Sequence, residues 1–239
     1  MPAEPGLRLK GNIFADPEYF RTDVAKGVTR TPGGTRMCTL PSDFLLGLRD
    51  AIIYECGGSH RSITKAAGKR WGTQFAKRLD RELTAHYGSA FRELSPGIIR
   101  TCLADAFNAH GYGRLSISPI PEDSEFTVAE VTDPIMPSLV RESDRSVDQL
   151  SAGMLGAVWS HIAGKALDCV QSDCPSLGGD RSRFLIGPPA RIQELETWIA
   201  EAPQMPTHEQ IVERATRKAY VEQALPHTIT EGAVTPTPY

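Results

Sequence analysis

The stretch CPSLGGDRSRFLIG, residues 174–187, decides how the fold of this chain is interpreted. It starts with a cysteine, passes through a Gly-Gly-Asp turn and ends in a short apolar run that predicts a strand. The preceding segment ALDCVQSD, residues 166–173, predicts a second strand joined to the first by this turn. A cysteine beside a tight turn is typical of half a metal site, so the question is where the other ligands would lie.

A helix rich in small residues precedes this pair of strands. The segment DQLSAGMLGAVWSHIAGK predicts a helix that ends near Gly164. One side of this helix has only small side chains, namely Ala152, Gly153, Gly156, Ala157 and Ser160. A helix side with only small side chains allows another backbone to approach closely or leaves room for a ligand. After the two strands, Pro188 and Pro189 open a last helix over ARIQELETWIAEA.

Three further helices are predicted in the first half of the chain. The first has Ser42 as its predicted cap and ends at Gly57–Gly58. The second runs from about Ser62 to Tyr87 and carries an apolar residue at every fourth position. The third opens at Ser95–Pro96 and ends at Gly111. The many lysines and arginines of the second helix are interleaved with acidic residues, which predicts a solvated face.

The remaining segments complete an α/β pattern. YGRLSISPI and EFTVAEV alternate apolar with polar residues and are separated by PEDS, which predicts a hairpin or two adjacent strands. The order is therefore three helices, two strands, a helix, two strands and a helix. It predicts an antiparallel sheet of about four strands that is covered by helices.

The chain divides into three predicted parts. Residues 1–40 form an N-terminal arm. The aromatic residues of NIFADPEYF are expected to attach this arm to the body of the domain, and they are Phe14, Tyr19 and Phe20. Residues 41–202 form one domain. Residues 203–239 are predicted to be a Pro-rich linker, a short helix over IVERATRKAYVEQAL and a disordered end outside the fold.

Composition excludes several classes of protein. The net charge of -3 provides no concentrated positive field, so no nucleic-acid partner is expected. No apolar run approaches the length of a membrane span and no signal peptide is evident, so a cytoplasmic protein is expected. The five cysteines are irregularly spaced, which argues against a disulfide framework. Neither a nucleophile elbow, a His-Glu-x-x-His zinc motif, a phosphate loop nor a dinucleotide fingerprint is present, so no catalytic residue is predicted.

The element order and the end motif resemble the 4-vinyl reductase domain family, which shares its α/β fold with the vesicle-tethering TRAPP components. In that family a small-residue helix precedes a strand with Glu-x-x-Cys, and a second Cys and a Phe follow. Gln171, Cys174, Ser182 and Phe184 stand at those positions here. The resemblance covers about residues 11–201, and a stand-alone member of the family is the best match.

The resemblance also bears on whether this chain can bind a zinc ion. Zinc-binding members of the family use thiolates and a carboxylate, but this chain keeps only Cys174 and has Gln171 and Ser182 at the other two positions. One matched thiol is too few for a zinc site, so no metal is expected. The turn is expected to hold its shape through Gly178, Gly179 and hydrogen bonds of Asp180 instead.

Members of this family have several functions. They include accessory proteins of bacteriochlorophyll synthesis, sensor domains for small aromatic hydrocarbons and proteins linked to photosystem assembly. The resemblance therefore implies a non-enzymatic, homodimeric protein that binds a small hydrophobic molecule, such as a tetrapyrrole or its precursor, for carriage, sensing or pigment-related assembly. Two alternatives stay open: an accessory subunit or enzyme in vinyl reduction of a chlorophyll precursor, and an adaptor that binds an assembly partner protein without any ligand.

The predicted ligand site lies between the small-residue helix and the aromatic stripe of the second helix. Its predicted residues are Trp71, Phe75, Phe107, His110, Gly156, Trp159, Ser160 and His161. Large aromatics opposite thin residues would form the apolar cavity that small ligands require. The alternative is that the aromatics are ordinary core, that the histidines contact helix-end carbonyls, and that close backbone packing fills the space.

Overall fold

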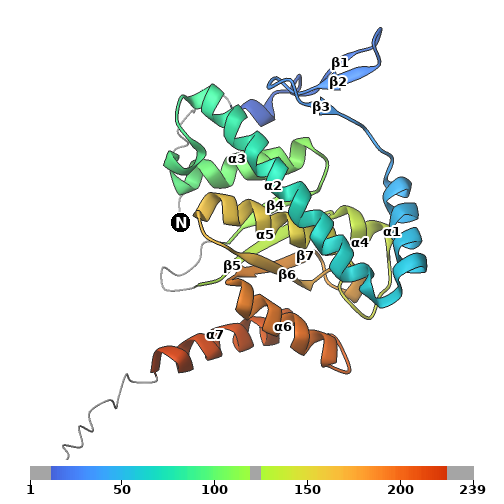
Figure 1. The fold of residues 1–239 in the computed structure, drawn as a ribbon, viewed down its shortest axis with the longest axis vertical. Coiled ribbons are helices and arrows are strands. Elements are labelled where there is room, and N and C mark those ends of the chain that lie inside the picture. The colour runs from blue at the N-terminus through green and yellow to red at the C-terminus, as the bar shows by residue number, and fades with distance from the viewer. Residues whose placement is uncertain (1–11, 119–124, 225–239) are drawn as a thin grey trace, which may run out of the picture.

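The computed structural model describes residues 12–118 and 125–224, and it shows three layers (Figure 1). The middle layer is an antiparallel sheet with the order β4-β5-β7-β6. Its strands are β4 (Arg114–Ile117), β5 (Thr127–Thr132), β6 (Asp168–Asp173) and β7 (Ser182–Gly187). The predicted four-stranded sheet covered by helices is therefore confirmed. The predicted PEDS turn and the end of the chain beyond residue 224, for which disorder is predicted, lie outside the described residues.

Alternation along the strands supplies a core on each face of the sheet. Cys169 and Phe184 belong to the larger core, which α2 (His60–Tyr87), α3 (Pro96–Ala109) and α5 (Gln149–Ala163) cover. Their neighbours Val170 and Leu185 belong to a second core under α6 (Pro189–Glu201). Successive strand residues point to opposite faces, so both faces can be apolar and buried.

Helix ends follow the sequence signals with one exception. The Ser95 side chain accepts a hydrogen bond from the backbone N–H of Ile98, as its capping role predicts. The first helix, α1 (Ser42–Cys56), starts after Pro41 instead, and no side chain caps it. Ser42 is therefore its first helical residue, which corrects the predicted cap. The short helix α4 (Ile135–Leu139) was not predicted, because one and a half turns leave no periodic pattern. Among the described residues, no helix is long and apolar enough to cross a membrane.

The N-terminal arm contains a small sheet that the sequence did not predict. Its strands, β1 (Arg21–Asp23), β2 (Val28–Arg30) and β3 (Arg36–Met37), pair antiparallel in that order. The arm is attached to α2 through the buried carboxylate of Glu82. This carboxylate accepts hydrogen bonds from the Tyr19 hydroxyl at 2.6 Å and from the Thr31 hydroxyl at 2.7 Å. Burial and the bond to Glu82 raise the pKa of Tyr19 well above its ordinary value.

The predicted boundary at residue 202 needs a correction. The helix α7 (His208–Ala224) packs under the sheet beside α6 (Figure 1). Ile211 and Ala215 are buried there with exposed fractions of 0% and 1%. The Arg214 guanidinium lies over the ring of Trp198, 4.7 Å from its centroid. The Pro-rich linker before this segment predicts separation from the domain, yet its apolar residues complete the second core.

Candidate functional site

The residues at the motif positions form hydrogen bonds to one another. Gln171 Nε2 donates to Ser182 Oγ at 3.1 Å, and Gln171 Oε1 accepts from the backbone N–H of Asp148 at 2.8 Å. Both side chains have an exposed fraction of 0%. The carboxamide therefore joins β6 to β7 and to the residue that precedes α5.

The donor set around Cys174 does not fit zinc. The Cys174 thiol is buried, and burial raises its pKa, which favours the protonated form over the thiolate that zinc requires. The neighbouring carboxamide and hydroxyl are weak zinc ligands. Within residues 12–118 and 125–224, no group of three or more His, Cys, Asp or Glu side chains is arranged to hold a metal ion.

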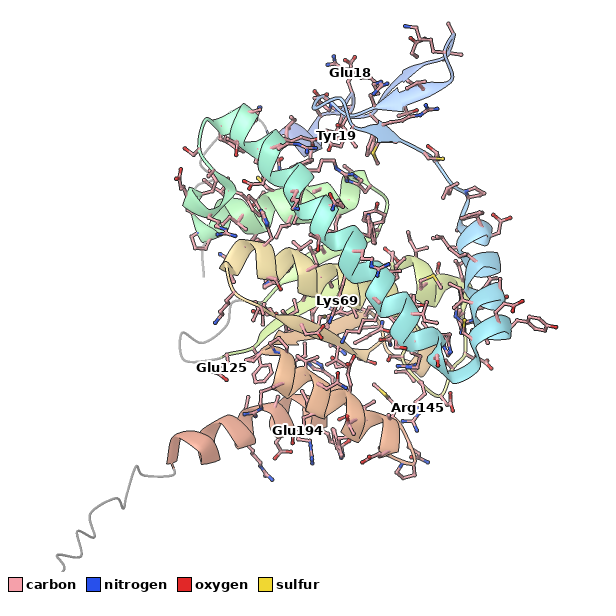
Figure 2. All side chains as sticks on the ribbon, in the orientation of Figure 1. Glu18, Tyr19, Lys69, Glu125, Arg145 and Glu194 are labelled. Carbon is pink, nitrogen blue, oxygen red and sulfur yellow. The ribbon has the colours of Figure 1, made fainter. Side chains whose placement is uncertain are left out.

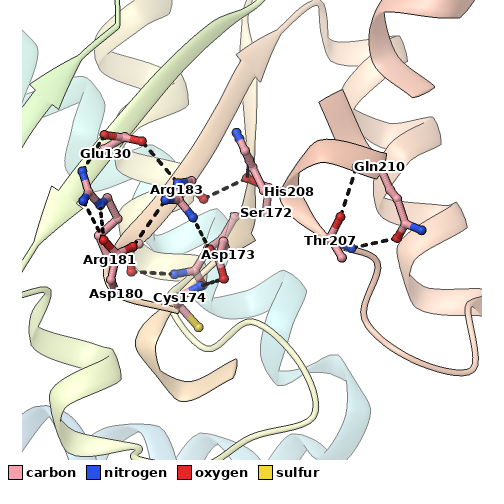
Figure 3. A network of polar contacts seen from close by, with 12 residues as sticks. Glu130, Ser172, Asp173, Cys174, Asp180, Arg181, Arg183, Thr207, His208 and Gln210 are labelled. Atoms are coloured by element: carbon pink, nitrogen blue, oxygen red, sulfur yellow. Dashed lines mark hydrogen bonds and ion pairs between the residues drawn. The ribbon is translucent and has the colours of Figure 1, made fainter. Parts of the chain in front are cut away.

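Ion pairs hold the turn after Cys174 (Figure 3). Asp180 accepts hydrogen bonds from Arg181 and from Arg183, and Arg183 also pairs with Asp173 on β6. Gly178 has a φ of +91°, a conformation that favours glycine. The polar groups at this end of the sheet are thus satisfied by the chain itself.

Four of the predicted ligand residues come together as a cluster of rings. Phe75 lies 6.2 Å from Trp71, 6.4 Å from Phe107 and 5.3 Å from His110, measured between ring centroids. His110 Nδ1 donates to the carbonyl of Ala106 at 2.7 Å, so Nε2 is the acceptor for the Arg78 guanidinium at 2.9 Å. Burial lowers the pKa of His110 to about 4, so the ring is neutral at pH 7.

The other four predicted residues lie along α5. Gly156 faces β6 rather than α2, since an added Cβ would stand 3.2 Å from the Cys169 nitrogen. Ser160 accepts from the backbone N–H of Leu167 at 2.9 Å, and His161 contacts Asp80 at 3.2 Å. Trp159 packs against the larger core. Ser160 and His161 border a hollow of about 490 Å³ at the end of α5. A ligand-binding role for the eight residues stays a prediction.

Direct backbone contact fills the space between α2 and α5. An added Cβ at Gly153 would lie 2.1 Å from the Lys65 carbonyl oxygen, and one at Gly68 would lie 2.1 Å from the Leu150 carbonyl oxygen. At Gly72 the corresponding distance to the Met154 carbonyl oxygen is 2.5 Å. The small residues therefore allow α2 and α5 to pack closely where they cross. This is the alternative to a ligand cavity that the sequence left open.

An apolar groove lies instead where α1, α4, the first two turns of α2 and the start of α5 meet. We use the name apolar groove for a hollow of about 310 Å³ whose apolar lining is Leu45, Leu48, Ile52, Ile53, Ala67, Met136, Val147 and Leu150. The groove exists because α1 has no buried residue and touches the body mainly through α4 and α2 (Figure 1). The rest of the lining is polar or charged: Arg49, His60, Arg61, Thr64, Ser143, Asp144, Arg145, Ser146 and Gln149.

A cationic hollow adjoins the apolar groove. We use this name for a space of about 510 Å³ bordered by Arg61, Lys65, Lys69, Arg145, Asp168 and Glu196, of which Figure 2 marks Lys69 and Arg145. Lys65 Nζ lies 3.1 Å from Asp168 and 2.6 Å from Glu196. Lys65 is only 8% exposed and is therefore an exception to the predicted solvated face, whereas Lys69, Arg70, Lys77 and Arg81 are exposed as predicted. The spacing of four between Arg61, Lys65 and Lys69 is the signal that could have revealed a shared face.

Comparison with known proteins supports the fold. The sequence matches no protein-family model and no curated protein. The phenol-responsive sensory domain of the transcription activator PoxR, solved with phenol, aligns with a TM-score of 0.60 and 17% identity over 76% of this chain and 87% of its own. The chain therefore shares the fold of that domain, and the α/β resemblance inferred from the sequence is confirmed at the level of fold.

Two further solved structures match less closely. A vinyl-4-reductase family protein from Methanocaldococcus jannaschii aligns with a TM-score of 0.44 and 15% identity over 63% of this chain and 82% of its own. A trafficking protein particle complex subunit 3 from Naegleria fowleri, covalently bound to palmitic acid, aligns with a TM-score of 0.40 and 15% identity over 61% of this chain and 93% of its own.

Proposed function

We propose that this protein binds a small hydrophobic molecule in the apolar groove. The observation that carries the proposal is the groove itself: a hollow of about 310 Å³ in which eight apolar residues are joined by polar and charged ones, among them Arg61, Asp144 and Arg145. Small-molecule sites are concave, mostly apolar and about 300–1,000 Å³ in volume. The likeness in fold to a sensory domain solved with phenol agrees with such a role. Binding would serve carriage, sensing or scaffolding.

The size of the apolar groove bears on the identity of the molecule. Its volume lies at the lower end of the range for small-molecule sites, which favours a compact ring compound. A tetrapyrrole or its precursor, the larger candidate from the sequence, would need α1 to move outward. Freshly purified protein that absorbs visible light would support the larger candidate, and native mass spectrometry would give the mass of any retained molecule.

A substitution that fills the apolar groove tests the proposal. Ala67 lines the groove and is exposed on α2, so Ala67→Trp adds a large ring to the hollow without disturbing the core. We expect calorimetry to show that 2-naphthol binds the wild type and binds Ala67→Trp at least about tenfold more weakly, since the ring occupies its place. Ala51→Trp is the control, because Ala51 is exposed on α1 away from the lining. Equal affinity in all three proteins, or no binding to the wild type, contradicts the proposal.

We also propose that the chain forms a homodimer through the outer side of α1. Phe44 and Tyr54 do not line the apolar groove, and they are 49% and 87% exposed. Apolar side chains gathered on one surface are typical of protein interfaces. We expect light scattering to give twice the 26.1 kDa chain mass at micromolar concentration, and Phe44→Glu with Tyr54→Glu to give the monomer. A monomeric wild type would refute the proposed dimer, but it would not bear on the proposal that a ligand binds in the apolar groove.

A further inference from the structure

The apolar groove and the cationic hollow share part of their lining. Arg61, Arg145, Ser146 and Gln149 border both spaces. Arg61 belongs to the first turn of α2, Arg145 and Ser146 to the segment that leads into α5, and Gln149 is the first residue of α5. A molecule seated in the apolar groove therefore has one end beside these polar groups.

The carboxylates of the cationic hollow form ion pairs with its lysines. They do not form ion pairs with its arginines. Asp168 contacts both Lys65 and Lys69, and Glu196 contacts Lys65. The Arg61 guanidinium instead donates to neutral oxygens of Ser146, at 2.8 Å to the carbonyl and 3.0 Å to the hydroxyl.

Arg145 is arranged in the same way. Its guanidinium donates to the carbonyl oxygens of Ile199 at 2.7 Å and Ala202 at 2.6 Å, at the end of α6. In the part of the chain that the structure describes, neither guanidinium forms an ion pair with a carboxylate. Two positive charges thus stand at the border of the groove without a direct ion pair, although the Asp144 carboxylate lines the same groove.

The burial of Arg61 adds a reason for an anion to bind there. Burial lowers the pKa of Arg61, and the charge of Arg145 acts in the same direction, whereas Glu196 and Asp144 oppose them through space. The guanidinium has lost part of its hydration and lies near a like charge. A carboxylate that accepts hydrogen bonds from it would replace that hydration, and such charge-assisted bonds are stronger than neutral ones.

We infer that the molecule bound in the apolar groove is a hydrophobic monocarboxylate, whose apolar body fills the groove and whose carboxylate is held by Arg61 beside Arg145. The inference rests on the proposed function, since it needs an occupant of the groove. Arg61 would set the specificity for the anionic group, while the apolar groove would supply affinity for the body of the molecule.

The test compares two probes that differ only in charge. Calorimetry would measure the affinities of 2-naphthoate and of neutral 2-naphthamide for the full chain. We expect 2-naphthoate to bind about tenfold to a hundredfold more tightly, because it gains a charge-assisted hydrogen bond. Arg61→Gln should remove this preference and leave the affinity for 2-naphthamide unchanged. The preference should also shrink as salt is added.

Controls keep the outcomes separate. Arg70→Gln is the matched control, because Arg70 is exposed on the same helix and lines neither the apolar groove nor the cationic hollow, so the preference for 2-naphthoate should stay. If Arg61→Gln does not fold, Arg145→Gln provides a second test, since Arg145 borders both spaces and its guanidinium contacts carbonyl oxygens rather than a carboxylate. Its removal should weaken 2-naphthoate binding alone, because it takes away the second positive charge at the border of the groove.

Each remaining outcome counts against one statement only. Equal affinity for the two naphthalene probes overturns the carboxylate inference but leaves the proposed function standing. Tighter binding of 2-naphthyl phosphate than of 2-naphthoate overturns the carboxylate in favour of a phosphate. A preference for 2-naphthoate that Arg61→Gln does not change overturns the role of Arg61. Failure of both naphthalene probes and of 2-naphthol to bind refutes the proposed function itself.

Discussion

Replacing Gly153 by alanine is expected to destabilise the fold by at least about 3 kcal/mol, the upper end of what overpacking usually costs. The added Cβ would lie 2.1 Å from the Lys65 carbonyl oxygen and 2.8 Å from the Lys69 nitrogen. Both atoms are backbone, so no side chain can rotate away and the two helices must separate. That separation would weaken the contact between α2 and α5 along its length. Urea unfolding followed by circular dichroism measures the loss.

Gly97→Ala is the control for this prediction. Gly97 also lies in a helix, α3, but an added Cβ there meets nothing within 4 Å. Alanine is the better helix former, so Gly97→Ala should leave the stability unchanged or raise it by up to about 1 kcal/mol. If Gly153→Ala costs no more than Gly97→Ala, α2 and α5 do not pack as closely as described.

Replacing Gln171 by leucine is expected to cost about 3 kcal/mol. The change leaves the Asp148 backbone N–H without its partner and takes the donor from the Ser182 hydroxyl, both in the dry interior. Each buried polar group left unpaired costs about 1–3 kcal/mol. Burial already raises the pKa of the Asp148 carboxyl, so this end of α5 has little solvent to compensate. The midpoint of thermal unfolding should fall accordingly.

Two further variants separate hydrogen bonding from packing. Gln193→Leu makes the same exchange at an exposed position of α6, and it should change the stability by no more than about 0.5 kcal/mol. Adding Ser182→Ala to Gln171→Leu removes one of the unpaired groups, so the double variant should be more stable than the sum of the single changes indicates. Strict additivity would show that the bond between Gln171 and Ser182 contributes nothing.

The sheet and most helices could be predicted because their signals are local. Alternation predicts β6 and β7, and the Ser95 cap predicts the start of α3. The strands β1 to β3 could not be predicted in this way, because they have two or three residues each and are largely exposed. Their position depends instead on Glu82, which bonds Tyr19 across 63 positions of the sequence.

The candidate site could not be predicted from local patterns, for a physical reason. A lysine on a helix is normally solvated, so Lys65 was assigned to the surface with its neighbours. It is buried because it meets Asp168 and Glu196, and the second of these lies 131 positions away in the sequence. The apolar groove likewise depends on where α1 lies, and nothing within the α1 sequence specifies its distance from α2.

The loose attachment of α1 has a kinetic and thermodynamic consequence. A helix without a buried residue has a low free energy of local opening, so its amide hydrogens exchange with solvent long before those of α2 or β7. If the apolar groove is occupied as proposed, opening of α1 would widen it and let the occupant enter. Any molecule that contacts α1 must then slow that exchange, by a factor that grows with its concentration relative to its dissociation constant.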